Sequence, residues 1–242
     1  MKKMKIIIEK DYENMSKTTM QLLLGKMYQD KEVHLAITAG STPKRMYEML
    51  VAEMSEKAPL TNVCYYNFDE IPIGEEKFGV TIGNLKKMYF DPAGIPEEQI
   101  HVLDTKNYTE HEAHLKRVGG LDAILIGIGE DGHFCGNLPG VTKFGDETRL
   151  VSVDSRPDMH DILLGEVGGD PNKVPEYYVT MGPKSVMHAK EIIMFANGKK
   201  KAAIIKKALQ GEVTEEVPSS IFQLHPNFTV VLDTEAASEL SR

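Results

Sequence analysis

The stretch Ile126-Gly127-Ile128-Gly129-Glu130-Asp131-Gly132-His133 decides the fold, because an apolar run ends there in glycines that lead directly into an acid and a histidine. The segment from Leu121 to Ile128 is almost entirely apolar, which predicts a strand buried on both faces. Glycine reaches backbone angles that other residues resist, so the chain can turn sharply after this strand. In an open α/β sheet, ligands bind at the carboxyl ends of the strands. Asp131 and His133 are therefore expected to project into a crevice, and the alternative is an ordinary polar turn.

Strand and helix patterns alternate along the whole chain. The clearest helix spans Asp11 to Gln29, with Met15, Leu23 and Met27 on one apolar side. This alternation predicts an α/β fold with a mostly parallel sheet and helices on both faces. No repeat or linker divides the sequence, so residues 1–242 are expected to form a single domain. The expected strands are Lys5 to Glu9, His34 to Thr38, Cys64 to Phe68, Ile100 to Leu103, Leu121 to Ile128, Tyr178 to Met181, Glu191 to Ala196 and Phe228 to Leu232. The other expected helices are Pro43 to Glu53, Tyr108 to Arg117, Lys199 to Leu209 and Thr234 to Leu240.

The composition argues against several classes of protein. A formal charge of -8 disfavours a nucleic-acid partner, because phosphate backbones require a basic face, but it allows a small anionic substrate. Cys64 and Cys135 do not form a spaced set, which argues against a disulfide scaffold or a zinc knuckle and fits a reducing compartment. The segment Met1 to Lys10 is too short for a signal peptide or a membrane span. We therefore expect a cytoplasmic protein without a membrane partner.

A second glycine turn, Thr38-Ala39-Gly40-Ser41-Thr42-Pro43, follows one expected strand and precedes an expected helix. Gly40 permits close backbone approach, and Ser41 and Thr42 supply hydroxyl groups. The amino end of the helix presents free N–H groups to an anion. The turn is a candidate phosphate seat, and the alternative is a simple helix cap made by Ser41 or Thr42.

Two adjacent acids end another expected strand in Asn67-Phe68-Asp69-Glu70. Their side chains point in different directions, so at most one of them faces the crevice. An acid in that position, aligned with a histidine from a neighbouring strand, can act as a general base, whereas capping or a salt bridge is the alternative. The glycine turn, the acid and the Asp131/His133 loop would all converge on one crevice, which unrelated capping residues would not do.

Cys135 lies two residues after His133 and is a weak candidate nucleophile. A Cys/His pair needs the thiolate beside the imidazole, and residues two apart in an irregular loop seldom meet in this way. Metal binding by Asp131, His133 and Cys135 is not expected, because no further ligand with suitable spacing follows. We interpret Cys135 as a small wall residue.

These motifs together resemble the glucosamine-6-phosphate deaminase and 6-phosphogluconolactonase superfamily. The resemblance runs over the whole chain and includes Ala39 to Pro43, Phe68 to Glu70, Gly129 to His133 and the tail Gln223-Leu224-His225-Pro226. It implies a Rossmann-like α/β domain that acts on a sugar 6-phosphate without a metal or an organic cofactor. The chain looks most similar to a bacterial group of glucosamine-6-phosphate deaminase-like proteins. Its oligomeric state, including a homo-oligomer, stays open.

The resemblance also implies roles for individual residues. In the deaminases, the acid that matches Asp69 moves a proton between C2 and C1 of the sugar, which isomerises the amino sugar to a ketose and expels ammonia. The histidine that matches His133 opens the pyranose ring, and the acid that matches Asp131 orients it. The phosphate would rest on Gly40, Ser41 and Thr42, with the residue that matches Lys201 closing on it as a point charge.

The sequence departs from the deaminase pattern at several positions. The glutamate that completes the histidine dyad into a triad falls on Leu138. The arginine that deaminases place on the substrate phosphate has no counterpart, since the matching region reads Leu164-Gly165-Glu166. Arg149 or Arg156 would replace it only if the loop folds back. Lys184 is a candidate replacement cation, with a solvated lysine as the alternative.

The loop from Gly129 to Gly140 has the length and the Leu138-Pro139-Gly140 ending of the lactonases. In those enzymes the histidine that matches His133 acts as a general base on the attacking water, and no triad glutamate is needed. Against this interpretation, lactonases usually follow the Asp-Glu pair with arginine, and here Ile71 occupies that position.

Two further segments give weaker signals. The stretch from Val151 to Lys173 is glycine-rich with weak periodicity, so we expect an irregular segment that is either a lid on the crevice or an ordinary surface insertion. The chain ends soon after the helix expected over Thr234 to Leu240, without the longer tail of the allosteric hexameric deaminases. No allosteric site of that kind is therefore expected.

Three functions follow from these observations. The leading one is a sugar-phosphate isomerase of the deaminating type, shifted in substrate because the triad acid is absent. The second is a hydrolase of the 6-phosphogluconolactonase type. The third is a sugar-phosphate-binding regulator with weakened catalysis.

Overall fold

Seven parallel strands form the central sheet of the computed structural model, which describes residues 4–55 and 60–241. Their order is β1-β10-β9-β6-β2-β3-β5, and each neighbouring pair is parallel. This arrangement confirms the expected α/β class with a mostly parallel sheet. The strands are β1 (Lys5–Glu9), β2 (Val33–Ala36), β3 (Val63–Tyr66), β5 (Ile100–His101), β6 (Ala123–Ile126), β9 (Ile192–Ala196) and β10 (Phe228–Asp233).

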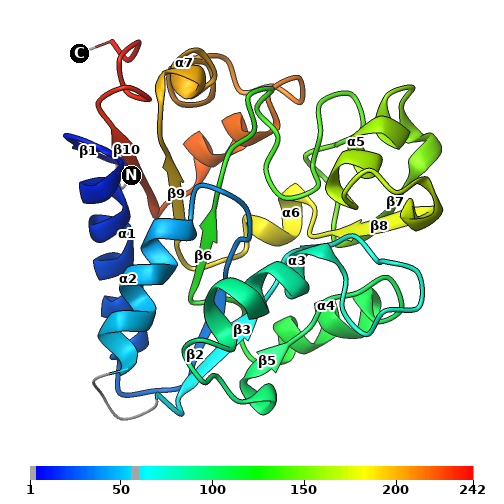
Figure 1. Cartoon of the computed structure of the whole chain (residues 1–242). Coiled ribbons are helices and arrows are strands. Elements are labelled where there is room, and N and C mark those ends of the chain that lie inside the picture. Colours follow the sequence, from blue (N-terminus) through cyan, green and yellow to red (C-terminus); the bar gives the residue numbers. More distant parts are fainter. Residues whose placement is uncertain (1–3, 56–59, 242) are drawn as a thin grey trace.

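Helices cover both faces of this sheet (Figure 1). Successive strand residues point to opposite faces, so Ala123 and Leu125 pack on the side of α1 and α2, whereas Ile124 and Ile126 pack on the side of α4 and α7. Within the described part of the chain, no helix has the length and apolar character needed to span a membrane. The helices are α1 (Tyr12–Met27), α2 (Lys44–Ser55), α3 (Val80–Leu85), α4 (Tyr108–Arg117), α5 (Met159–Glu166), α6 (Pro183–Val186) and α7 (Ala202–Gln210).

A second, three-stranded sheet lies beside the central one and was not expected. It contains β4 (Asp69–Glu70), β8 (Tyr177–Thr180) and β7 (Arg149–Ser152), and both of its pairings are antiparallel. The strand expected over Tyr178 to Met181 exists, but its assignment to the parallel series was wrong. Local sequence patterns do not encode strand direction, and here β4 pairs with β8 immediately after the chain leaves β3.

Two segments differ from the expected secondary structure. The helix expected over Thr234 to Leu240 is a series of turns, in which the Ser238 hydroxyl donates to the Glu235 carbonyl at 2.7 Å and competes with helical pairing. The stretch from Val151 to Lys173 is less irregular than expected, because α5 lies within it. The positions of Met159, Ile162 and Leu163 have helical spacing, and the glycines that follow obscured this signal.

Asp122 ties together the amino ends of three neighbouring strands. Its carboxylate accepts hydrogen bonds from Lys31 Nζ at 2.6 Å, Lys190 Nζ at 3.0 Å and the backbone N–H of His34 at 2.9 Å. Burial by itself would raise the pKa of Asp122, but these donors hold the charged form and lower the pKa to about 2. The ionised carboxylate therefore fixes the edge of the sheet opposite the strand ends that bear the glycine turns.

We predict that Asp122→Asn lowers the free energy of unfolding at pH 7 by about 2 kcal/mol, because the folded-state pKa lies below the unfolded value near 3.9. The contribution is present above pH 4 and is lost as the pH falls from about 4 to 2. Urea unfolding across this range measures it, with the exposed Asp161→Asn as the matched control. A difference between Asp122→Asn and wild type that persists unchanged at pH 2 contradicts the prediction.

Candidate active site

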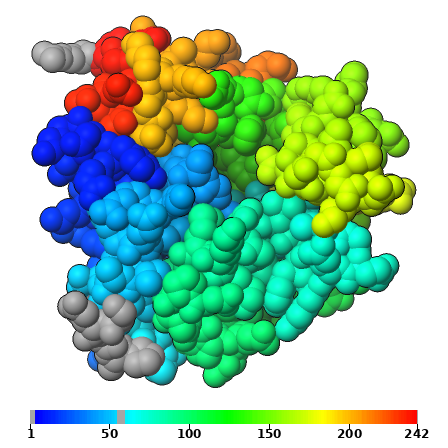
Figure 2. All heavy atoms as spheres, in the orientation of Figure 1, coloured from blue at the N-terminus to red at the C-terminus, as the bar shows by residue number. Residues whose placement is uncertain are grey.

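A cavity of about 510 Å³ opens where β2, β3 and β6 end. Figure 2 shows the surface hollowed between the cyan, green and yellow-green segments. The glycine turn after β2 lines one side, Asp69 after β3 lines another, and the loop after β6 supplies Gly129 and His133. Parallel strands end at one edge, so three segments that are distant in sequence meet there.

The turn after β2 lies against the amino end of α2. Gly40 has a φ of +106°, a conformation that side-chain-bearing residues rarely adopt. The Tyr12 hydroxyl donates to the Thr42 carbonyl at 2.9 Å, and the Tyr47 hydroxyl donates to the Thr38 carbonyl at 2.6 Å. These bonds hold the turn in place, and Gly40, Ser41 and Thr42 all line the cavity.

Lys201 supplies a cation to the same cavity from the residue that precedes α7. Its ammonium donates to the Ile128 carbonyl at 2.6 Å, which ties it to the loop that follows β6. Burial lowers the pKa of Lys201, while the neighbouring acids Glu130 and Asp131 oppose that shift. A half-buried ammonium beside a glycine turn at a helix amino end is suited to bind a phosphate.

Asp131 and His133 form a hydrogen-bonded pair in the loop after β6. Asp131 Oδ1 lies 2.6 Å from His133 Nδ1 and also accepts from the His133 backbone N–H at 3.0 Å. Burial alone would raise the pKa of Asp131, but the hydrogen bonds and the charge of His133 lower it to about 2. Asp131 therefore stays ionised and orients the ring, which leaves Nε2 of His133 for proton transfer. His133 lines the cavity. Asp131 does not line it and lies behind the ring, where it hydrogen-bonds to Nδ1 of His133.

The glycines of this loop are required by the close approach of the ring. A Cβ at Gly129 would lie 2.2 Å from Nδ1 of His133, closer than any real contact. Gly132 has a φ of +91°, and the Gly129 N–H donates to the His133 carbonyl at 2.8 Å. The turn therefore folds back on itself and presses the imidazole against bare backbone.

Asp69 and Glu70 have separate functions in the structure. Glu70 is 3% exposed, and its carboxylate accepts from the backbone N–H groups of Ile71, Thr81 and Ile82 at 2.7–3.0 Å. It therefore caps the start of α3, although burial raises its pKa to about 7. Asp69 instead faces the cavity, as expected for one acid of the pair.

The environment of Asp69 makes it an unusually basic carboxylate. Burial raises its pKa to about 6, and the charge of Glu166 adds to this effect. The Thr81 hydroxyl donates to Asp69 Oδ1 at 3.0 Å. This hydrogen bond and the charge of His133 both act to lower the pKa of Asp69, against the effect of burial. A carboxylate of this strength is still largely ionised at neutral pH and is well suited to remove a proton from carbon.

Cys135 lines the cavity as a wall residue. Burial and the charge of Asp69 raise the pKa of its thiol well above the ordinary value, so it stays protonated and is a poor nucleophile. Its φ of +49° is the single positive value among the described non-glycine residues. This strained backbone conformation lies next to Gly136, whose N–H donates to Thr180 Oγ1 at 3.0 Å and holds the loop against β8.

The cations expected as replacements for the missing arginine lie elsewhere. Lys184 pairs with Glu147 at 2.9 Å and does not line the cavity. Arg149 donates to Asn137 Oδ1 at 2.9 Å, and Arg156 is held by Asp158 at 2.7 Å, so neither guanidinium lines the cavity. Leu138, at the position of the absent triad acid, is buried and contributes to the cavity wall.

The structure adds Glu166, which was not among the predicted site residues. It lies on α5 with Met159, Ile162 and Leu163, and all four line the cavity. The segment from Val151 to Lys173 thus forms one wall of the site rather than an ordinary surface insertion. The helical spacing of these four residues was the available signal, but nothing local indicated that they face Asp69.

The sequence is similar to a known family and to named proteins. The family model described as glucosamine-6-phosphate isomerases/6-phosphogluconolactonase matches residues 10–231. A glucosamine-6-phosphate deaminase from Shouchella clausii is 32% identical, with 97% of each chain covered. Another from Clostridium acetobutylicum is 32% identical over 98% of this chain and all of its own.

Solved structures give the same picture. A monomeric glucosamine-6-phosphate deaminase superposes with a TM-score of 0.85 at 25% identity and covers 98% of this chain and all of its own. A 6-phosphogluconolactonase from Trypanosoma cruzi superposes with a TM-score of 0.74 at 20% identity, covering 100% and 99% of the two chains. The second likeness establishes the shared fold.

We predict that Thr81→Val raises the pKa of Asp69 above about 6, because the substitution removes a hydroxyl donor that stabilises the ionised carboxylate. A carbon NMR titration of the aspartate carboxyl groups, assigned with Asp69→Asn, measures this shift. Thr109→Val, at an exposed position on α4, is the matched control. Titration of Asp69 near pH 4 in wild type, or the same value in Thr81→Val, would show that this account of the carboxylate is wrong.

Proposed function

The chain belongs to the glucosamine-6-phosphate isomerase/6-phosphogluconolactonase family, and we propose that it acts as a single-domain glucosamine-6-phosphate deaminase. The observation that supports this function best is the meeting of two proton-transfer groups in one cavity. Asp69, with a pKa raised to about 6, and His133, oriented by Asp131, both line it beside a phosphate seat. The match to the named relative covers 97% of each chain, and the solved deaminase structure has the same fold over 98% of this chain.

In the proposed reaction the phosphate binds at Gly40, Ser41 and Thr42 and pairs with Lys201. His133 moves a proton between the ring oxygen and the anomeric hydroxyl through Nε2, which opens the pyranose. Asp69 then removes the proton at C2 while the aldehyde oxygen takes up a proton from solvent, which gives an enolamine, and Asp69 returns its proton to C1 to give a protonated ketimine. Water adds to the ketimine, and ammonia leaves with the ketose phosphate as the second product.

We predict that Asp69→Asn lowers the rate of ammonia release from glucosamine 6-phosphate by about 10²- to 10⁴-fold, because the amide cannot accept the C2 proton. The assay follows ammonia and fructose 6-phosphate together, with Asp161→Asn as the control for loss of a carboxylate. Full deaminase activity in Asp69→Asn would refute the assignment of the base.

The lactonase function is the second candidate, and Leu138 is the observation that favours it. Leu138 is buried in the cavity wall, at the position where the deaminase pattern has an acid. In a lactonase, His133 would activate water against the ester carbonyl, and Asp69 would not be the base. Opening of 6-phosphogluconolactone above its spontaneous rate, retained in Asp69→Asn and lost in His133→Ala, would select this function. Binding of sugar phosphates without turnover would instead support the third function, a sugar-phosphate-binding regulator.

We predict that Lys201→Met raises KM for the sugar phosphate by about 10- to 100-fold, since a hydrogen bond to a charged group contributes about 1.5–3 kcal/mol. The value of kcat should change less, because the ammonium binds the phosphate and not the reacting carbons. Steady-state kinetics measure both, with the exposed neighbour Lys200→Met as the matched control. An equal effect of the two substitutions on KM would contradict a specific role for Lys201.

A further inference from the structure

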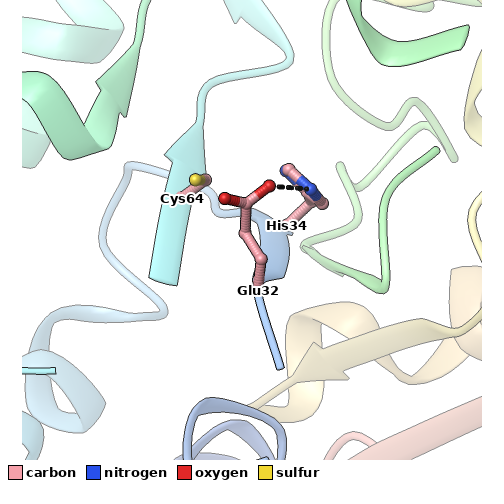
Figure 3. A group of neighbouring side chains, drawn as sticks. All are labelled: Glu32, His34 and Cys64. Carbon is pink, nitrogen blue, oxygen red and sulfur yellow. Dashed lines mark ion pairs between the residues drawn. The ribbon is translucent and has the colours of Figure 1, made fainter. Parts of the chain in front are cut away.

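A second group of ligating side chains lies at the amino ends of β2 and β3, at the edge of the sheet opposite the cavity. Glu32, His34 and Cys64 each present one ligand atom, and these atoms lie within 4.8 Å of one another (Figure 3). His34 and Cys64 are register partners on neighbouring strands, so their side chains emerge on the same face. Glu32 precedes His34 by two residues and shares that face.

The imidazole of His34 is oriented by a buried hydrogen-bond chain. Its Nδ1 lies 2.9 Å from the Tyr66 hydroxyl, which in turn lies 3.0 Å from Nε2 of His114. The Tyr66 ring also stacks on its register partner His101, with centroids 4.7 Å apart. Because Nδ1 is engaged, Nε2 is the atom that faces the cluster, and it lies 3.1 Å from Glu32 Oε1. An outer partner of this kind fixes the tautomer of metal-binding histidines.

The neighbouring charges leave the Glu32 carboxylate available to a cation. The ammonium groups of Lys31 and Lys190 bind Asp122 at 2.6 and 3.0 Å, and Asp122 is 5% exposed. Both lysines are therefore directed toward another carboxylate. The Glu32 side chain is 67% exposed and its carboxylate already lies between Cys64 and His34 (Figure 3), so it can adjust to an ion without moving a strand.

We propose that Glu32, His34 and Cys64 bind one Zn²⁺ ion. A thiolate, an imidazole and a carboxylate form a ligand set that suits this borderline-soft ion. Zinc–ligand distances of about 2.0–2.3 Å place tetrahedral ligand atoms roughly 3.5 Å apart, so the three ligand atoms, now within 4.8 Å of one another, would approach by up to about an ångström. The Cys64 thiol proton passes to solvent on binding, and water occupies the fourth position on the exposed side.

The ion would join β2 to β3 and stabilise the folded chain, away from the reaction. His34 and Cys64 each lie four residues before the cavity-lining residues Thr38 and Phe68, which is roughly 13 Å along an extended chain. The proposal therefore does not depend on which reaction the cavity performs. Its consequences are metal affinity and thermal stability rather than a change in catalytic rate.

The test is a titration of the chelator-treated full chain with Zn²⁺ by calorimetry and with Co²⁺ as an optical probe. We expect one equivalent to bind, with a sulfur-to-cobalt charge-transfer band. Cys64→Ser should abolish the band and weaken Zn²⁺ binding more than about 100-fold, beyond the loss that an outer-shell partner causes. Glu32→Gln, at an exposed position that leaves folding intact, should weaken binding by at least about 10-fold.

Two variants serve as controls for these losses. Cys135→Ser removes the other thiol of the chain, and Glu98→Gln removes an exposed carboxylate elsewhere, so both should bind Zn²⁺ as wild type does. The absence of a thiolate band in wild type would overturn the proposal. So would a band that survives in Cys64→Ser or disappears in Cys135→Ser, and so would unchanged affinity in Glu32→Gln.

Discussion

Parallel pairing of β2 with both β3 and β6 is the constraint on which the rest of the structure depends. Because the three strands run in one direction, the glycine turn after β2, Asp69 after β3 and the loop after β6 all emerge at one edge. Close packing at this edge then imposes a further requirement on the loop after β6. The imidazole of His133 lies so close to Gly129 that the backbone there must lack a Cβ. The cavity is thus a consequence of strand direction and close packing together.

Burial at this edge of the sheet accompanies different pKa values for neighbouring carboxylates. Glu70 is buried and satisfied by three backbone N–H groups, so it organises the start of α3. That helix brings the Thr81 hydroxyl to Asp69, which faces the cavity and has a pKa raised to about 6. Asp131 has the opposite shift, because its hydrogen bonds to His133 outweigh its burial. Burial outweighs the donors at Asp69 and Glu70 and raises both pKa values, whereas the hydrogen bonds to His133 outweigh burial at Asp131, and this difference supports their separate proposed roles.

Much of the fold was predictable because local patterns encode it. The expected strand over Lys5 to Glu9 and the expected helix over Tyr108 to Arg117 agree with β1 and α4 to the residue. The antiparallel sheet was not predictable, since the pattern of β8 is the same whichever way its partner runs. The helix expected over Thr234 to Leu240 was wrong because side-chain hydrogen bonds compete with helical pairing there. For Lys184, the resemblance suggested a replacement cation for the site, but the residue pairs with Glu147 and does not line the cavity.

The sequence by itself determined the α/β class, the family and the residues that end the central strands, because apolar periodicity and glycine motifs are local properties of the chain. Only the tertiary structure decided which side chains share an environment. It placed Glu166 from α5 opposite Asp69, and it joined Cys64 to Glu32 and His34, which lie about thirty residues earlier in the chain. The physical reason is that strand register determines the distances between side chains, and burial contributes to the pKa values of their titratable groups. Neither quantity can be obtained from the spacing of residues along the chain.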